Sequence, residues 1–581
     1  MSQLRTDAIV DADGTGAPEF TNGLSSQGTI KLNGNYPVGT QNVALGDTAL
    51  DSVQSGGNYN VAIGHGSLTA NTTGDDNSAV GRSSLTSNTT GTENTAIGKS
   101  SAEANTTGDS NTSIGRHSLL SNTTGSSNTA LGTQALNSNT TASSNTAVGY
   151  RAGYSNTTGT LNTFIGETSG DALTVGTRNV SLGQGSLTSD TKGSRSVAVG
   201  QGALNNQNFT SATDAYNTAV GNAAGSQITT GTDNTLIGGS AGDAITTSNA
   251  NTALGRLALS AETTSNGNTA IGAEALKNQN VGGSGDARNT AVGLLAGANV
   301  STGIDNTLIG ALAGDALTDA DYNVAIGKSS LSTDTLGSRN VAVGYGSLTN
   351  QNFTSATNSY NVAMGFNAGE QITTGTSNTL VGGLAGDAIT DGSNNVVVGV
   401  SALTTNTRGT KIVALGNGAG RNFNQTANTN DTNNVFLGHN AAENASTGVN
   451  NVVIGGDASA MSSSMHAGAD LTTGGNNVFI GRGATGSAAN CDAQVVLGFE
   501  AAGASNTSLT FGKAATDSNI DFGATSITAP SDERYKENIQ TSTAGLSFLN
   551  DLRPVTYKWK MEKDVPVNSK SYREGSETRV M

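Results

Sequence analysis

Hydrophobic and polar positions along this chain repeat with a period of about 17 residues over most of its length. Each period contains a five-residue phrase, N-[TV]-[AS]-[ILV]-G, as at 60–64, 77–81, 94–98 and 111–115. β-branched residues at the second and fourth positions of the phrase favour an extended strand, whose side chains alternate between two faces. One unit is too short to bury a core, so the units must stack. The pattern predicts an all-β fold, a repetitive parallel β-roll or β-solenoid rod.

The phrase also predicts which side chains face the interior. Its fourth position is Ile, Val, Leu or Met in nearly every copy, and we expect this column to point inward. The third position then lies on the opposite face. Where it is large, as at Phe164, Leu236, Leu308, Leu380, Phe436 and Phe479, it needs a partner. Self-association about the rod axis, as a closed cyclic oligomer, would supply that partner.

Glycine and asparagine mark the corners of each unit. The fifth position of the phrase is Gly in every copy, which predicts a positive φ or a backbone approach that a Cβ would block. The recurring N-T-T-G, as at 88–91 and 105–108, predicts a turn, because Asn and Gly tolerate left-handed geometry. Each unit is therefore expected to run as strand, tight corner, short strand and turn.

A longer period is superimposed on the shorter one. Between 200 and 416 the spacing of the phrase runs 17, 17, 17 and 21, which makes a 72-residue super-repeat. The extension recurs at the same corner of every fourth unit, and insertions in solenoids often form a binding face. Its aromatic residues are candidates either for packing on the coil or for receptor contact: Phe209, Tyr216, Phe353 and Tyr360.

Composition excludes several classes of function. The 581 residues include 79 Gly, 12% charged and 4% aromatic residues, and the net charge is −16, so nucleic-acid binding is not expected. The single Cys491 excludes an intrachain disulfide. No apolar run is long enough for a transmembrane helix, and the N-terminal stretch 1–20 lacks the apolar core of a signal peptide, so we expect no export by the secretory route.

No constellation of a turnover enzyme is found in the repeats. The four histidines are scattered without metal-ligand spacing, and we expect no metal and no cofactor. Acidic residues recur at 72-residue spacing in the sequence G-D-A, at Asp171, Asp243, Asp315 and Asp387. Their periodicity indicates a structural corner rather than a pair of carboxylates that cleaves glycans.

The repeated phrase, followed by a small residue, resembles the head repeat of YadA-like trimeric adhesins over about residues 42–498. That resemblance implies a left-handed parallel β-roll with three chains about one axis. The units here are somewhat longer than those of the adhesin heads. The adhesins are also secreted and membrane-anchored, and neither feature is expected for this chain.

Residues 531–560, SDERYKENIQTSTAGLSFLNDLRPVTYKWK, resemble the start of an endosialidase-type intramolecular chaperone. Such domains stand at the C-terminus of bacteriophage tail fibres and tailspikes, trimerise the chain and often cleave themselves off. The resemblance implies that Ser531 is the nucleophile for the Pro530–Ser531 bond and that Lys536 is its base. The alternative for Ser531 is a helix N-cap followed by Asp532 and Glu533. Because the chain continues for only about 50 residues, we expect a truncated module.

These observations predict four segments. The first is a virion-attachment segment at 1–40, implied because its LRTDAIVDADGTGAPEFTNGL resembles the leading segment of many phage fibre proteins. The others are the repeats at 41–512, a linker at 513–530 and a short α+β chaperone segment at 531–581. The expected function is that of a homotrimeric bacteriophage tail fibre, made in the host cytoplasm and located in the virion. Its partners would be itself, tail or baseplate proteins at the N-terminus, and a glycan or outer-membrane receptor. A bacterial adhesin head and an ice- or carbohydrate-binding solenoid are the alternatives.

Overall fold

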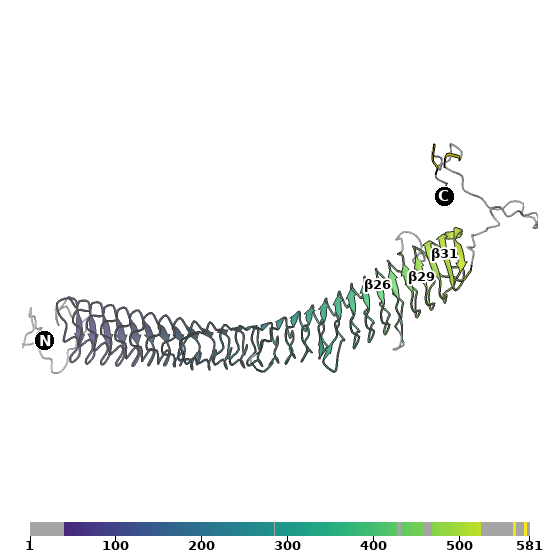
Figure 1. The fold of residues 1–581 in the computed structure, drawn as a ribbon. Coiled ribbons are helices and arrows are strands. Elements are labelled where there is room, and N and C mark those ends of the chain that lie inside the picture. The colour runs from purple at the N-terminus through teal and green to yellow at the C-terminus, as the bar shows by residue number, and fades with distance from the viewer. Residues whose placement is uncertain are drawn as a thin grey trace, which may run out of the picture. The chain divides into compact units, whose positions relative to one another are not determined.

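The stacked coils predicted from the sequence are present in the computed structural model. It describes residues 40–283, 285–426, 431–456, 467–524, 562–564 and 574–577. Among them a 28-stranded sheet forms as one coil follows another (Figure 1). The chain divides into two compact units, residues 1–527 and 528–581, and the sheet lies in the first. The all-β parallel solenoid is confirmed. Within the described residues, no helix has the length and apolar character needed to cross a bilayer.

The strands are short, and most have three residues. Those of the large sheet are β1 (Val43–Leu45), β2 (Val61–Ile63), β3 (Ser78–Val80), β4 (Thr95–Ile97), β5 (Thr112–Ile114), β6 (Thr129–Leu131), β7 (Thr146–Val148), β8 (Thr163–Ile165), β9 (Val180–Leu182), β11 (Val197–Val199), β13 (Thr218–Val220), β14 (Thr235–Ile237), β15 (Thr252–Leu254), β16 (Thr269–Ile271), β17 (Thr290–Val292), β18 (Thr307–Ile309), β19 (Val324–Ile326), β21 (Val341–Val343), β23 (Val362–Met364), β24 (Thr379–Val381), β25 (Val396–Val398), β26 (Val413–Leu415), β27 (Val435–Leu437), β28 (Val452–Ile454), β29 (Val478–Ile480), β30 (Val495–Phe499), β31 (Ser508–Lys513) and β32 (Ser518–Asp521). Two small sheets pair β10 (Gly193–Ser194) with β12 (Thr213–Asp214) and β20 (Gly337–Ser338) with β22 (Thr357–Asn358). Two 3-10 helices, η1 (Ala514–Thr516) and η3 (Glu562–Asp564), complete the described elements.

Identical positions of successive coils lie side by side. Strand β3 pairs in parallel with β4 so that Ala79 is opposite Ala96, and this register continues from coil to coil. We therefore number each coil from the Asn of the phrase, position 1, to position 17, and call one position in successive coils a column. In longer coils, position 17 denotes the last residue, directly before the next position 1. The stack ends where β32 pairs antiparallel with β31.

The predicted orientation of the strand side chains is wrong. Position 3 is fully buried in coil after coil, as at Ala62, Ala96 and Phe164, whereas Ile97 at position 4 is 41% exposed. The interior of a three-residue strand has room for a single column, and the small position 3 occupies it. Positions 2 and 4 point outward, so the column with most β-branched and large aliphatic residues lies on the surface of the single chain.

Large residues at position 3 do not need a partner from another chain, which corrects a second prediction. Phe164, Leu236, Leu308, Leu380, Phe436 and Phe479 are all fully buried within the stack. A Cβ on Gly153 or Gly170, both at position 9, would lie 2.6 or 2.4 Å from the Phe164 ring. Ordinary coils combine Ala at position 3 with Leu at position 9, as at Ala130 and Leu136. In these examples, the coil with a large residue at position 3 has Gly at position 9, and the coil with Ala at position 3 has Leu at position 9. The interior volume is thus kept nearly constant.

Glycine at position 5 is required for both predicted reasons. Gly98 has φ of +133°, and a Cβ there would lie 2.7 Å from the carbonyl carbon and oxygen of Gly115 in the next coil. The N-T-T-G corner differs from the prediction. Its Gly91 has no positive φ and is needed because a Cβ would lie 2.5 Å from the oxygen of Gly108. The left-handed residues are instead those at positions 7, 9 and 17, such as Ser83, Leu85 and Asp76.

Buried asparagines connect the coils along two columns. At position 12, Asn88 Nδ2 donates to Asn71 Oδ1 at 2.8 Å and to the Gly91 carbonyl at 2.9 Å. At position 1, the backbone N–H of Asn77 donates to Asn60 Oδ1 at 3.0 Å, and Asn77 Nδ2 donates to the Gly91 carbonyl at 2.9 Å. These bonds satisfy polar groups that the corners would otherwise bury unpaired.

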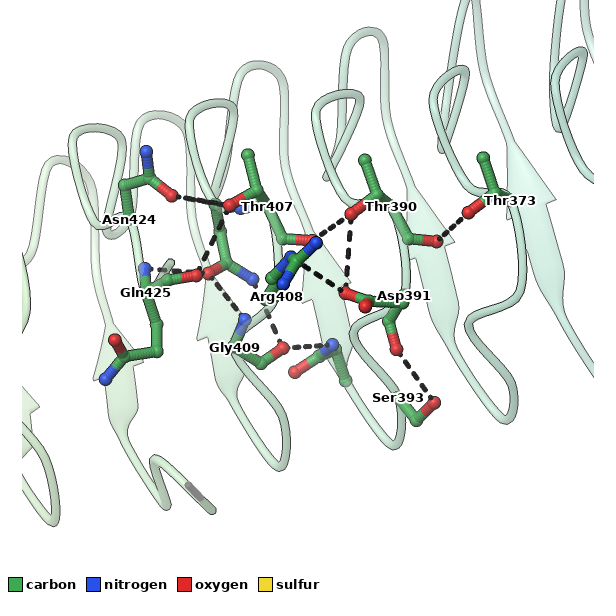
Figure 2. A network of polar contacts seen from close by, with 11 residues as sticks. Thr373, Thr390, Asp391, Ser393, Thr407, Arg408, Gly409, Asn424 and Gln425 are labelled. Carbon is green, nitrogen blue, oxygen red and sulfur yellow. Dashed lines mark hydrogen bonds and ion pairs between the residues drawn. The ribbon is translucent and has the colours of Figure 1, made fainter. Parts of the chain in front are cut away.

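A threonine column at position 13 adds a third line of bonds on the partly buried side of the corner. Thr373 Oγ1 donates to the carbonyl of Thr390 at 3.2 Å, and Thr390 Oγ1 donates to that of Thr407 at 3.0 Å (Figure 2). The column changes at Thr407, whose hydroxyl donates to Asn424 Oδ1 at 2.9 Å. The short second strand predicted for every unit is absent from the ordinary coils of the described residues, which have turns there. Two-residue strands occur only beside two extended coils.

Candidate functional site

The exposed side of the strands carries nearly all of the large apolar surface. We call this side, positions 2 and 4 of β2 to β30, the strand face. Among the described residues, every large apolar side chain that is exposed lies at position 2, 4, 6 or 17, except Val175 and Phe522. Leu131, Ile237 and Met364 at position 4 are each 36–44% exposed. A continuous one-sided apolar strip of this kind marks an interaction surface rather than scattered surface residues.

Two columns border the strand face. The leading edge is position 17, just before each strand, and the trailing edge is position 6, just after it. Each column forms contacts along the stack. On the leading edge, Ser110 Oγ donates to Glu93 Oε2 at 2.9 Å. On the trailing edge, the rings of Tyr345 and Phe366 stack with centroids 5.5 Å apart and planes inclined by 12°.

The four aromatic residues predicted for binding fall into two kinds of environment. Phe209 and Phe353 are buried, and Thr191 Oγ1 donates to the Phe209 carbonyl at 2.9 Å. These rings pack on the preceding coil, as the packing interpretation expects. Tyr216 and Tyr360 are about half exposed and occupy the leading edge. The tyrosines, but not the phenylalanines, are therefore accessible for contact.

A buried carboxylate anchors each of the first three extensions, and we did not identify it from the sequence. Asp190 at position 12 accepts hydrogen bonds from Gln207 Nε2 at 2.7 Å and from the backbone N–H groups of Gly193 at 2.9 Å and Phe209 at 3.2 Å. Burial raises the pKa of Asp190, and these donors partly oppose the shift. The signal was available, because an acid replaces Asn at position 12 of every fourth coil.

The same network recurs at every fourth coil. Gln351 Nε2 donates to Asp334 Oδ2 at 2.6 Å, and Gln279 Nε2 donates to Glu262 Oε2 at 3.2 Å. At the fourth occurrence Asn406 replaces the acid, and it still accepts from the N–H of Gly409 at 3.0 Å. The amide oxygen therefore does the same structural work as the carboxylate. The network is an anchor for a loop and offers no reacting group to a ligand.

The four aspartates of the G-D-A sequence lie at position 10 and are half-buried. Burial raises the pKa of Asp171, Asp243 and Asp315, and raises that of Asp387 to about 6. Consecutive members are four coils apart, which is about 19 Å at the spacing of parallel strands. Glycosidase carboxylates lie about 5–10 Å apart. The geometry favours the structural corner predicted for these residues.

The remaining candidates cannot be placed. Ser531 and Lys536, implied as the self-cleavage pair, lie outside the described residues, as does the 1–39 part of the predicted attachment segment. Within the described residues, no group of three or more His, Cys, Asp or Glu side chains is arranged to hold a metal ion. Cys491 is buried, and burial raises the pKa of its thiol, so it is a packed side chain rather than a reactive one.

Comparison with known proteins assigns one part of the chain. Residues 531–575 match the family described as chaperone of endosialidase. The match begins at Ser531, the residue at which the sequence resemblance begins. No curated protein matches the chain. The C-terminal unit is thus similar to an intramolecular chaperone, and the unit before it is a parallel β-solenoid.

Proposed function

We propose that this protein is a tail fibre of a tailed bacteriophage, a homotrimeric rod that contacts the host surface during adsorption. The observation that carries the proposal is the match of residues 531–575 to the chaperone of endosialidase, directly following a long β-solenoid. A chaperone of this kind would solve a folding problem that the rod presents. Its coils are nearly identical, so they must be brought into one register.

The strand face supports a trimer. Each coil leaves one partly exposed aliphatic side chain at position 4, and covering it stabilises an assembly by about 1 kcal/mol per coil. Because the same position recurs in every coil, these small contributions add along the stack. A single chain in water would leave the whole strip uncovered. The face therefore fits association of parallel copies along their length.

The proposal extends to one self-cleavage event. Ser531 Oγ attacks the carbonyl carbon of Pro530, and the C–N bond breaks as the Ser531 nitrogen takes a proton. Lys536 receives the hydroxyl proton and returns it to this nitrogen. Water then hydrolyses the ester, so the net reaction is hydrolysis of one peptide bond. Lys536 must be neutral to act, which requires a desolvated site.

Adsorption tests the proposal directly. The purified chain is expected to sediment and scatter light as a trimer, to bind cells of one bacterial host and to block infection by the phage that encodes it. A trimer that binds no host cell, combined with genomic neighbours that encode a secretion apparatus instead of tail proteins, contradicts it in favour of an adhesin.

Self-cleavage has a separate readout. On a denaturing gel the chain is expected to show a fragment that ends at Pro530, and Ser531→Ala and Lys536→Ala are expected to abolish it. An uncut chain with Ser531 intact contradicts cleavage but leaves the trimeric rod unaffected.

A further inference from the structure

The two edges of the strand face carry complementary side chains on either side of the same strand. The clearest examples flank β3 and β4, where the leading edge has Asp76 and Glu93 and the trailing edge has Arg82 and Lys99. We propose that copies of this chain pack side by side with the leading edge of one against the trailing edge of the next, in register. This inference rests on the proposed homotrimer and specifies how its chains meet.

The basic residues of the trailing edge need a partner that the chain itself does not supply. Arg82, Lys99 and Arg116 follow one another at position 6, one strand spacing apart. None of them forms an ion pair with another residue in the described parts of the chain. Burial lowers the pKa of His117, and the charges of Arg116 and Lys99 lower it further. In a protein of net charge −16, an uncompensated basic column is an unusual feature that an acidic surface would neutralise.

Further along the stack the complementarity changes from ionic to aromatic. Three successive strands, β19, β21 and β23, each lie between a residue of the leading edge and a residue of the trailing edge. These pairs are Tyr322 with Lys328, Arg339 with Tyr345, and Tyr360 with Phe366. These are two cation–aromatic pairs and one aromatic pair, the types that stabilise interfaces. All six side chains are in the columns that border the strand face. The exposed tyrosine of the extended coil thereby gains a partner that does not have to be a host molecule.

Within one chain some of these residues already contact their neighbours in the same column. The Arg339 guanidinium carbon lies 4.8 Å from the ring centroid of Tyr322, and the Lys328 ammonium lies 6.0 Å from that of Tyr345. The columns are therefore ordered lines of charges and rings. Ordered side chains lose less conformational freedom when a partner binds.

The difference between the edges also limits the symmetry. A two-fold contact through the trailing edge alone would bring Arg82 and Lys99 of one chain towards the same residues of the other. A heterologous contact joins the trailing edge of one chain to the leading edge of the next, so a joined pair keeps one free leading edge and one free trailing edge. Such a contact closes into a ring when the rotation allows it. A trimer of parallel chains meets both requirements.

Disulfide trapping tests the contact in the full chain. The double variant Glu93→Cys and Lys99→Cys is expected to form covalent trimers under mild oxidation, because each chain supplies one half of two links. The single variants should form none. A pair placed far apart along the stack, Glu93→Cys with Lys328→Cys, is the matched control and should also form none. Five extended residues between positions 93 and 99 span about 16 Å, too far for a link within one chain.

The results separate this inference from the proposed trimer. A native trimer by light scattering without covalent trimers in the double variant overturns the edge contact alone. A monomer overturns both. Covalent dimers from a single variant would indicate a two-fold contact and overturn the inference as well.

Charge exchange provides a second measurement if the cysteine variants fold poorly. Reversal of the trailing edge by Arg82→Glu with Lys99→Glu is expected to lower the temperature at which the trimer dissociates. Adding Asp76→Lys and Glu93→Lys should restore at least half of the loss. A quadruple variant that dissociates no later than the double variant overturns the inference.

Discussion

Two blocks of the solenoid share one backbone but differ in their interior. In the first block, coils 60–178, position 12 is a column of buried asparagines that ends at Asn156. In the second block, coils 179–411, this column repeats three times in groups of four, as an acid, Gln and two aliphatic residues, and ends at Asn406. The buried apolar residues also separate into two clusters, one ending at Leu173 and the other beginning at Leu187. The boundary falls where Ser181 replaces Ala at position 3.

The comparison shows how a stack of similar coils can be held in one unique register. A column of identical asparagines fits equally well if the chain slips by one coil. In the second block, a slip by one coil would place Asp190 opposite an aliphatic side chain instead of Gln207. Burying an unpaired carboxylate is expensive, so the four-coil pattern excludes that slip. The first block has no such pattern at position 12. Its register therefore depends more on other contacts, such as those of the charged edges.

The largest expected effect concerns the feature that both blocks share. Gly98→Ala in the first block and Gly327→Ala in the second each force a Cβ against the next coil at φ near +133°. Each should destabilise its coils by more than about 3 kcal/mol, because the backbone cannot move without breaking the register. Hydrogen exchange of the neighbouring strand amides measures the loss.

Gly202→Ala is the control for this prediction. Gly202 also has a positive φ, +66°, but no atom lies within 4 Å of the position of its Cβ. Its replacement should cost only about 1 kcal/mol. If hydrogen exchange is equally fast in the Gly98→Ala and Gly202→Ala variants, the close approach between coils is not the cause of the destabilisation.

The next effect tests whether interior volume is exchangeable between positions 3 and 9. Phe164→Ala should cost about 3–5 kcal/mol, because it leaves a cavity between Gly153 and Gly170. Adding Gly153→Leu recreates the Ala and Leu combination of an ordinary coil and should recover about half of the loss. Leu136, one coil earlier, adopts the same left-handed φ of +48°, so the backbone accepts Leu there.

Thermal unfolding of the two variants measures this exchange. Gly153→Leu alone is the control and should be destabilising, because its side chain would collide with the Phe164 ring. If Gly153→Leu fails to improve Phe164→Ala, the combination of sizes is not the rule that distinguishes these coils.

A smaller effect is confined to the second block. Asp190→Ala removes the acceptor of four donors and should cost about 2–3 kcal/mol. Asp190→Asn should stay within about 1 kcal/mol of the parent, since Asn406 already accepts from Gly409 at the equivalent place. Hydrogen exchange at Phe209 reports directly on the anchored loop. Similar exchange in both variants would show that the acceptor oxygen is not what anchors the extension.

The sequence was sufficient for the fold but misleading about its faces. The period, the parallel register and the requirement for Gly98 follow from local pattern and sterics. The orientation failed because hydrophobicity was taken to indicate the chain's own interior. Ala96 has little hydrophobicity but is buried, whereas Ile97 is more apolar and exposed. A pattern that serves an assembly cannot be separated from one that serves a core when only one chain is considered.

The candidate sites show a second limit of the sequence. Phe209 and Tyr216 belong to the same extension and look alike as aromatic residues, yet one is buried and the other is about half exposed. What distinguishes them is the network of Asp190 and Gln207, which holds the Phe209 backbone. That network joins residues from consecutive coils, so it becomes visible only after the coils are aligned in columns.

The smallest expected effect is a pH dependence that comes from Asp387 in the second block. The pKa of Asp387 rises from 3.8 to about 6 on folding, mainly because its carboxylate is half-buried and also because Glu370 is near. A raised carboxyl pKa means that the folded chain holds the proton more tightly. Its favourable contribution is complete below pH 4 and is lost as the pH rises through about 6. The effect should be less than about 1 kcal/mol, because water screens the exposed half of the group.

Asp387→Asn isolates this contribution. The variant should match the parent at pH 4 and be more stable at pH 7, as judged by hydrogen exchange in β24 and β25. Glu370→Gln, which removes the neighbouring charge, should move the transition of the parent to lower pH without abolishing it. Amides of the first-block strands β4 and β5 provide the internal reference, since their exchange should not change with either substitution. A variant that follows the parent at every pH would show that Asp387 is fully hydrated and contributes nothing to the pH dependence.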